Sequence, residues 1–157
     1  MTTTRDAQVY AIAIGSNRFG RHGAPAATVR AAMAAIGGVI AASRIVPSAP
    51  IGPSTRQFAN AVVLLESREA PPQLLARLKT IERAFGRRGG RRWGARVLDL
   101  DIILWSGGIW SSPGLSVPHV GLAHRRFVLD PLATLAPGWR DPVSGRTIRQ
   151  LAMRARG

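Results

Sequence analysis

Two aspartates, Asp99 and Asp101, stand in an otherwise apolar stretch that runs from Val97 to Trp105. The stretch lacks glycine and proline and has the usual length of a strand. Because side chains alternate between the two faces of a strand, both carboxylates share one face, with Cα atoms about 6–7 Å apart. Neighbouring carboxylates repel each other and need cations or a metal ion when they are buried. The other face is expected to be core and carries Leu98, Leu100, Ile102 and Leu104.

Five arginines come just before this strand and could supply the cations; they are Arg87, Arg88, Arg91, Arg92 and Arg96. Guanidinium groups bind phosphate oxygens through paired hydrogen bonds. Mg²⁺ typically uses one or two carboxylates together with substrate phosphates. The combination predicts a site for a polyphosphate with Mg²⁺. A simpler alternative stays open at this point, in which the aspartates pair with neighbouring arginines and have no chemical role.

A further candidate for recognition lies between Phe58 and Glu66, where the pattern predicts a strand. Phe58, Asn60, Val62 and Leu64 would share one face of it. An amide beside an aromatic ring suits a flat heterocycle, although an amide that only satisfies nearby backbone groups is an open alternative. The sequence has no G-x-G-x-x-G, and Lys79-Thr80 lacks the glycines of a P-loop. A phosphate site would therefore depend on aspartate, Mg²⁺ and arginine.

The composition is that of one globular domain, residues 1–157, with an extreme positive charge. A chain of 157 residues with 46% hydrophobic content is long enough for a real core. The absence of cysteine excludes disulfides and cysteine zinc sites. No apolar run approaches the ~20 residues that span a bilayer, and the polar start is unlike a secretory signal, so we expect a cytoplasmic protein. The net charge of +14 attracts nucleotides, nucleic acid or anionic lipid.

The order of elements predicts an α+β fold of the ferredoxin-like kind, βαββαβ with C-terminal additions, in which helices pack on an antiparallel sheet. We expect a last helix over 147–154 and a helix that begins at Asp130-Pro131, where the aspartate would cap it, and ends near Pro137. A short strand is expected near Ile109-Trp110. The core strands are expected over 8–14, 39–46, 58–66 and 97–105, and the core helices over 25–36 and 71–85.

Several short motifs occur in one order along nearly the whole chain. The longest is Arg92-Trp-Gly-Ala-Arg-Val-Leu-Asp-Leu-Asp-Ile-Ile-Leu104. The others are Ala13-Ile-Gly-Ser-Asn17, Gly52-Pro53, Phe58-Ala-Asn60, Ile81-Glu82, Gly86-Arg87, Val117-Pro-His119 and Arg125-Arg-Phe127. Together they resemble the signature of the 6-hydroxymethyl-7,8-dihydropterin pyrophosphokinases of folate biosynthesis. The resemblance favours the catalytic interpretation of the two aspartates.

The resemblance implies transfer of pyrophosphate from the co-substrate ATP, with Mg²⁺, to the hydroxymethyl group of the reduced pterin, with release of AMP. It implies that Asp99 and Asp101 hold two Mg²⁺ ions and that Asp101 lies nearest the attacking hydroxyl. Arg87 and Arg96 would assist catalysis at the phosphates. Nucleotide-side positions would be Glu82, Arg88, Arg92, Trp93, Ile102, Ser116, His119 and Arg125. The pterin would lie between Phe58 and Phe127, with Asn60 at its edge and backbone groups of Ser48 and Ile51 assisting.

Three residues depart from the family pattern: Ala95 replaces a usual proline, Gly114 a common basic residue, and Val120 a proline or tyrosine. We expect these departures to affect rate and ATP affinity more than the activity itself. Two other functions stay open, a nucleic-acid-binding module and a catalytically weakened relative that still binds pterin. The first does not explain acids beside the arginines, which would repel phosphate without a metal. We expect a monomer that binds ATP and reduced pterin, no specific nucleic acid and no membrane.

Overall fold

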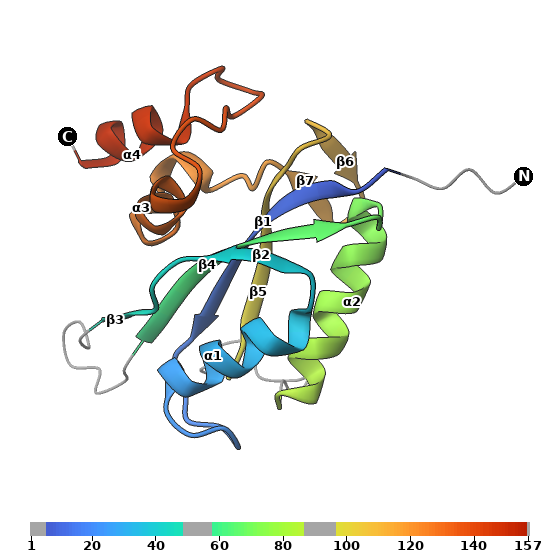
Figure 1. Ribbon diagram of the computed structural model, residues 1–157, viewed down its shortest axis with the longest axis vertical. Coiled ribbons are helices and arrows are strands. Elements are labelled where there is room, and N and C mark those ends of the chain that lie inside the picture. Colours follow the sequence, from blue (N-terminus) through green and yellow to red (C-terminus); the bar gives the residue numbers. More distant parts are fainter. Residues whose placement is uncertain (1–5, 49–57, 87–96, 157) are drawn as a thin grey trace, which may run out of the picture.

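The long strands of the computed structural model pair into one antiparallel sheet (Figure 1). The structure describes residues 6–48, 58–86 and 97–156. The strands are β1 (Gln8–Ser16), β2 (Val39–Ala42), β3 (Val46–Ser48), β4 (Phe58–Ser67), β5 (Asp99–Trp105), β6 (Trp110–Ser112) and β7 (Leu115–Val117). The helices are α1 (Pro25–Ile36), α2 (Pro71–Ala84), the 3-10 turn η1 (Leu122–His124), α3 (Arg126–Leu135) and α4 (Ile148–Arg156).

The strand order of the sheet is β2-β4-β1-β5, and β3 also pairs with β4. Strand β1 is therefore central, with β4 on one side and β5 on the other, both antiparallel to it. Helix α1 follows β1, and α2 connects β4 to β5. This is the ferredoxin-like α+β arrangement that the sequence predicts, so the predicted fold class is confirmed. Strands β6 and β7 form a separate hairpin after β5.

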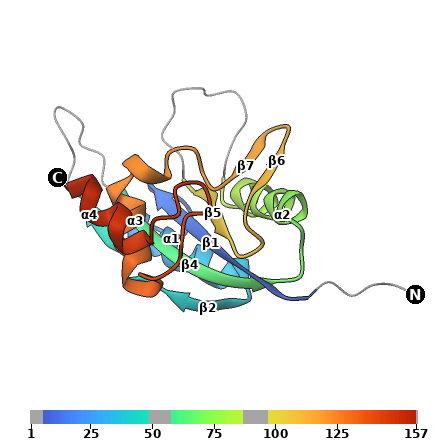
Figure 2. The ribbon, with the colours of Figure 1, turned by 90° about the horizontal axis from the view of Figure 1, so that it is seen from above.

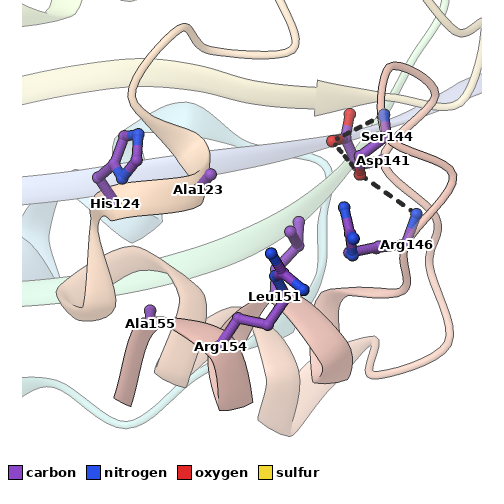
Figure 3. Close-up of a pocket in the computed structure, with 8 residues that line it drawn as sticks. All are labelled: Ala123, His124, Asp141, Ser144, Arg146, Leu151, Arg154 and Ala155. Atoms are coloured by element: carbon purple, nitrogen blue, oxygen red, sulfur yellow. Dashed lines mark hydrogen bonds between the residues drawn. The ribbon is translucent and has the colours of Figure 1, made fainter. Parts of the chain in front are cut away.

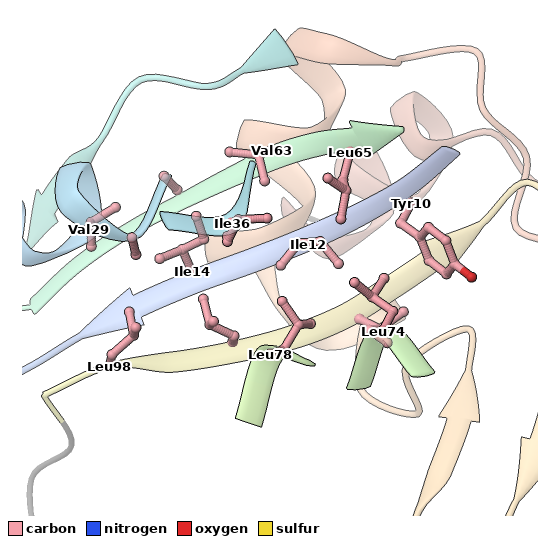
Figure 4. Close-up of a cluster of buried hydrophobic side chains, with 14 of the residues drawn as sticks. Tyr10, Ile12, Ile14, Val29, Ile36, Val63, Leu65, Leu74, Leu78 and Leu98 are labelled. Atoms are coloured by element: carbon pink, nitrogen blue, oxygen red, sulfur yellow. The ribbon is translucent and has the colours of Figure 1, made fainter. Parts of the chain in front are cut away.

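Helices α1 and α2 cover one face of the sheet, as Figure 4 shows. Both helices begin with a proline at the first position, where the missing N–H costs no helical hydrogen bond. Gly37 ends α1 with a φ of 69°, a conformation that favours glycine. The buried side chains of this first cluster include Ile12, Ile14, Val29, Ile36, Val63, Leu65, Leu74, Leu78, Leu98 and Leu100.

Helices α3 and α4, together with η1, cover part of the opposite face; Figure 2 shows them across the sheet from α2. This second cluster includes Ala11, Val62, Ile103, Leu104, Val128, Leu129, Leu132, Ile148 and Leu151. The central strands are thus buried on both faces over much of their length, which explains their nearly continuous apolar sequence. Toward the start of β5 the same face carries polar residues in place of apolar ones, and that end holds the candidate site.

The prediction that Leu104 shares the core face of Leu98, Leu100 and Ile102 is wrong. The pairing of β1 with β5 shifts register between Ala11 and Ile12, which face Leu104 and Ile102 respectively. One residue of β5 is therefore unpaired there, as in a β-bulge, and the alternation of side chains changes after it. Leu104 consequently packs with Ile103 in the second cluster, whereas Ile102 stays in the first.

Two other predicted elements differ. The expected strand over 39–46 is interrupted, because the Ser43 hydroxyl accepts a hydrogen bond from the Val62 N–H at 2.9 Å in place of a regular backbone partner. The helix expected to start at Asp130-Pro131 starts at Arg126, with Pro131 inside it. Asp130 does not cap this helix, because its carboxylate contacts Arg126 at 3.8 Å and Arg156 at 3.1 Å. The short strand β7 was not predicted.

Candidate active site

Strands β4 and β5 place polar residues on the two sides of β1, which contributes only small residues to the same row. Gly15 of β1 pairs with Asn60 of β4 on one side and with Asp99 of β5 on the other. Two residues along, Ala13 pairs with Asp101. Because alternate residues of a strand share a face, Asp99 and Asp101 point to the same side, which confirms the sequence prediction. Asn60 and Asp99 are about forty positions apart in the chain, and the pairing of β4 and β5 with β1 brings them together.

A small pocket of about 100 Å³ lies over this row. Its floor is the sheet, and one wall is the start of α3 with the residue before it. The residues that line it are Ala13, Ile14, Gly15, Asn60, Ala61, Asp99, Asp101, Arg125, Phe127 and Val128. The pocket thus combines two carboxylates, an amide, a guanidinium and an aromatic ring. These side chains suit a flat polar ligand that lies next to a cation held by the carboxylates or an anion held by the guanidinium.

Gly15 keeps the middle of the row open. A Cβ atom built at this position would lie 3.1 Å from the Asn60 Oδ1 atom, tighter than an ordinary contact. A larger side chain would therefore project between Asn60 and Asp99, where the pocket lies. A functional role of Gly15 was not predicted from the sequence. The available signal was the run of small residues at Ala11, Ala13 and Gly15 on one face of the strand, whose other face carries the large side chains of Tyr10, Ile12 and Ile14.

Arg125 connects the acidic row to the aromatic ring. Its Nη1 atom lies 3.9 Å from the Asp101 Oδ2 atom. Its guanidinium carbon lies 5.9 Å from the centre of the Phe127 ring, within cation–π range. Both side chains of the ion pair are about a third exposed to solvent, at 39% and 34%, so the pair adds little to stability. The ion pair matters for position, because it holds the guanidinium of Arg125, a group suited to phosphate, over the pocket.

His119 lies close to the same acidic pair. Its backbone N–H donates to the Ile103 carbonyl at 3.0 Å, and its Nδ1 atom accepts a hydrogen bond from the Gly121 N–H at 3.0 Å. The neutral ring therefore carries its proton on Nε2, which can donate. Burial lowers the pKa of His119 below its ordinary value of 6.5, and Arg125 lowers it further, whereas Asp101 and Asp99 act in the opposite direction.

We expect His119 to titrate below 6.5 when its Hε1 resonance is followed by NMR. Arg125→Gln should raise this pKa because a positive neighbour is removed, and Asp101→Asn should lower it further. Since the folded-state pKa lies below the unfolded one, the fold favours the neutral ring. This contribution to stability is complete above the unfolded pKa and is lost as the pH falls through the folded pKa. A pKa unmoved by either substitution would contradict this arrangement.

Glu82 of α2 is buried, with 2% of its surface exposed. Its Oε2 atom accepts a hydrogen bond from the Leu100 N–H at 2.8 Å. Leu100 lies between the two aspartates, so the carboxylate fixes the backbone of β5 at the point from which both of them project. The resemblance assigns Glu82 to the nucleotide side, which stays a prediction. The hydrogen bond indicates a positioning role, which was not predicted from the sequence.

Glu82→Ala is expected to lower the free energy of unfolding by about 2–3 kcal/mol, because it leaves the buried Leu100 N–H unsatisfied and opens a cavity. Glu82→Gln keeps an oxygen acceptor of the same size and should lose less. Urea unfolding followed by circular dichroism measures both values. Equal stability of the alanine variant and the wild type would show that the hydrogen bond has no structural weight.

The remaining predicted site residues have varied positions. The Ile102 side chain is 3% exposed and packs in the first cluster, so only its backbone faces the site side of β5. Ser116 is exposed on β7, opposite Ser111. Phe58 is the first residue of β4 and pairs with Ser48, the last residue of β3. The residues between them, 49–57, lie outside the described ranges. The residues that lie outside these ranges are Ile51, Arg87, Arg88, Arg92, Trp93 and Arg96.

The two aspartates are suitable ligands for a hard divalent cation. Mg²⁺ prefers carboxylate oxygens and completes its coordination with water and substrate phosphates, so a pair of carboxylates in a polar pocket fits it. Within residues 6–48, 58–86 and 97–156, no group of three or more potential protein ligands gathers at one point. The donor set therefore fits a metal that is shared with a phosphate substrate better than a metal held by the protein alone.

The fold and the pocket define a ferredoxin-like α+β protein whose site is lined by two carboxylates, an amide and an arginine, side chains suited to Mg²⁺ and phosphates. Residues 11–137 match the family model described as 7,8-dihydro-6-hydroxymethylpterin-pyrophosphokinase (HPPK). The chain belongs to this family. The predicted family resemblance is thereby confirmed.

Curated relatives named 2-amino-4-hydroxy-6-hydroxymethyldihydropteridine pyrophosphokinase agree with this assignment. The protein of Synechocystis sp. is 43% identical over 66% of this chain and 53% of its own length. The protein of Pseudomonas aeruginosa is 43% identical over 72% of this chain and 70% of its own length. That of Haemophilus influenzae is 37% identical over 80% and 79%. The chain thus covers about half of the first relative and more than two thirds of the other two.

Solved structures show the same fold. Wild-type HPPK-DHPS of Plasmodium falciparum, crystallised with pteroate, aligns with 98% of this chain at a TM-score of 0.72 and 14% identity. An HPPK-DHPS in complex with substrates aligns with 97% at a TM-score of 0.73 and 13% identity. This chain covers 43% and 45% of those longer chains. At such low identity the comparison establishes the fold alone.

Proposed function

We propose that this chain transfers pyrophosphate from MgATP to the hydroxymethyl group of 6-hydroxymethyl-7,8-dihydropterin and releases AMP. The observation that carries the proposal is the row of Asn60, Gly15 and Asp99 beside Asp101, in a pocket closed on one side by Phe127. A heterocycle-recognising amide and two phosphate-side carboxylates lie on one continuous surface. Membership of the pyrophosphokinase family supports the same reaction.

The pterin would occupy the pocket over Gly15. The Asn60 amide can both donate to and accept from the polar edge of the ring, and Phe127 can stack on its face. We place Phe58 on the opposite face, with backbone groups of Ser48 and Ile51 at the edge. This assignment agrees with the position of Phe58 two residues before Asn60 on the same strand.

Asp99 and Asp101 would hold Mg²⁺, which we expect as two ions. When bound, the metal neutralises phosphate charge and aligns the reacting oxygens. Asp101 is the carboxylate nearer to Arg125, so it lies at the junction of the pterin pocket and the phosphate side. Arg87, Arg88, Arg92 and Arg96, with Trp93, are proposed to bind and cover the phosphates. Their cations would stabilise the charge that develops as the bond breaks.

The nucleotide would bind beside Arg125 and His119. Arg125 would exchange its 3.9 Å contact with Asp101 for a phosphate oxygen once the aspartate binds metal. The neutral His119 would donate from Nε2 to the departing AMP. Glu82, Ile102 and Ser116 complete the proposed nucleotide side, with Glu82 acting through the β5 backbone.

Incubation with MgATP and 6-hydroxymethyl-7,8-dihydropterin, followed by separation of the nucleotides, tests the proposal. We expect AMP and a pterin diphosphate in equal amounts, because the pterin is held at one distance from the metal pair and the β-phosphorus must lie in line with its hydroxyl. ADP with a pterin monophosphate would show attack on the γ-phosphorus and contradict the proposal. Pterin binding without turnover would indicate the weakened relative. Omission of Mg²⁺ should abolish the reaction.

The expected partners are the two small-molecule substrates, and we propose a monomer. Within the described ranges, no helix is both long and apolar enough to cross a bilayer. Despite the net charge of +14, we propose no sequence-specific nucleic-acid site, because the polar pocket holds two carboxylates that would repel phosphate. We expect any nucleic-acid binding to be non-specific and to weaken steeply with salt.

A further inference from the structure

A second and larger cavity, of about 560 Å³, lies between η1, α4 and the turn that precedes α4. Figure 3 shows its lining side chains. Leu151, Arg154 and Ala155 face it from α4, where spacings of three and four residues put side chains on one face of a helix. The other lining residues are Ala123 and His124 of η1, and Asp141, Ser144 and Arg146 of the turn.

The cavity gathers cations from two separate elements. Arg146 comes from the turn and Arg154 from the helix, and neither forms an ion pair within the described part of the chain. The neighbouring arginines differ in this respect. Arg156, on the same helix, contacts Asp130 at 3.1 Å, and Arg125 contacts Asp101. The guanidinium groups of Arg146 and Arg154 thus border one cavity, whereas Asp101 and Asp130 form their ion pairs with other arginines.

Asp141, the carboxylate among the described residues that line the cavity, forms its hydrogen bonds within its own loop. Its Oδ1 accepts the Val143 N–H at 3.0 Å, and its Oδ2 accepts the Ser144 hydroxyl at 2.7 Å. The Gly145 N–H also donates to the Asp141 backbone carbonyl at 2.8 Å. This leaves the aspartate as the internal brace of the turn, which holds Ser144 and Arg146 in place. The turn is closed by the pairing of Arg140 with Thr147.

We propose that this cavity binds a small phosphate monoester with an apolar organic part. Two guanidinium groups match the two charges of a phosphate dianion, and their planar donors fit its oxygens. The His124 imidazole adds a polar group at the border. Leu151, Ala123 and Ala155 provide the apolar surface, and the volume lies within the range of small-molecule sites.

The site is separate from the active site but adjoins it through one short segment. Ala123 and His124 line the larger cavity, and the next residue, Arg125, lines the pocket over Gly15. Among the residues that the structure describes, none lines both cavities. Because the two sites share no lining residue, a ligand of the larger cavity should not compete directly with MgATP.

Calorimetric titration with phenyl phosphate, in EDTA and at 0.15 M salt to screen exposed charges, tests the proposal. We expect saturable binding that Arg146→Gln and Arg154→Gln each weaken about tenfold. Arg149→Gln is the matched control, because Arg149 is exposed on the same helix but does not line the cavity. It should change affinity less than about twofold. Benzoate and phenol, which lack the phosphate dianion, should bind at least about tenfold more weakly.

A second measurement locates the ligand. Phenyl phosphate should shift the backbone amide resonances of Ser144, Gly145 and Leu151 in the NMR spectrum of the wild type. These shifts should persist when saturating MgATP is added in a Mg²⁺ buffer. This readout decides the matter even where an arginine variant fails to fold. Equal weakening by Arg149→Gln and Arg154→Gln would indicate a general attraction to positive charge and overturn the site. Displacement of phenyl phosphate by MgATP, or a failure of phenyl phosphate to bind saturably, would overturn the site as well.

Discussion

Asp101→Asn should lower turnover by at least about 10³-fold, and Asp99→Asn by a similar factor. Each asparagine keeps the size of the side chain and removes one negative charge. The effect is expected to be large because these two are the only carboxylates among the described residues that line the pocket, where Asp99 pairs with Gly15 and Asp101 with Ala13 of β1. With one carboxylate lost, Mg²⁺ and the phosphates it aligns would lose a ligand that the described residues around the pocket do not replace.

The matched control is Asp130→Asn, which removes the same charge from a residue that contacts Arg126 and Arg156 outside the pocket. It should keep turnover within about twofold of the wild type. Circular dichroism verifies that all three variants fold, and nucleotide binding with and without Mg²⁺ isolates the metal step. If a folded Asp101→Asn enzyme retains more than about a tenth of the activity, Asp101 is not a metal ligand.

The sequence predicted this pair correctly because alternation along a strand is a local property. Asp99 and Asp101 needed only an extended backbone between them to share a face, and β5 is regular over those residues. Leu104 shows the limit of the same reasoning. Beyond the register shift opposite Ala11 and Ile12 the alternation changes, and nothing in the apolar sequence marks that shift.

The opposite wall of the pocket was not predictable from alternation. Arg125 is 24 positions from Asp101 in the chain and reaches it through η1 and the start of α3. The sequence predicted that α3 would start four residues later, at Asp130, because an aspartate before a proline is a common helix start. In the structure Asp130 lies inside α3, where its carboxylate contacts Arg126 one turn earlier in the same helix and Arg156 of α4. Only the family motif connected Arg125 and Phe127 to the site.

Glu82 illustrates a third kind of limit. A glutamate on a helix is usually solvated, and the sequence shows no reason for its burial. The structure gives the reason, which is the buried N–H of Leu100 at the place where β5 meets α2. Such a hydrogen bond couples two elements that are separated by the arginine-rich segment 87–96. The same carboxylate thereby fixes the strand on which the metal pair stands.

Gly15→Leu is expected to lower kcat/KM for the pterin by at least about 100-fold while the fold is kept. A Cβ at this position would already lie 3.1 Å from the Asn60 Oδ1 atom, so the rest of a leucine must fill the space between Asn60 and Asp99. This is the space proposed for the pterin ring. The substitution removes no charged group, so the loss would come from occlusion of the ring site alone. Steady-state kinetics with varied pterin measures it.

A graded series distinguishes occlusion from general damage. Gly15→Ala should lose less than Gly15→Leu, because Asn60 needs to give way by only a fraction of an ångström. Ala42→Leu introduces the same side chain at an exposed position of β2, outside the pocket, and should leave kinetics and thermal stability nearly unchanged. Binding of MgATP should persist in Gly15→Leu, since its phosphates are proposed to lie beyond Asp101. Normal pterin kinetics in a folded Gly15→Leu enzyme would place the pterin elsewhere on the sheet.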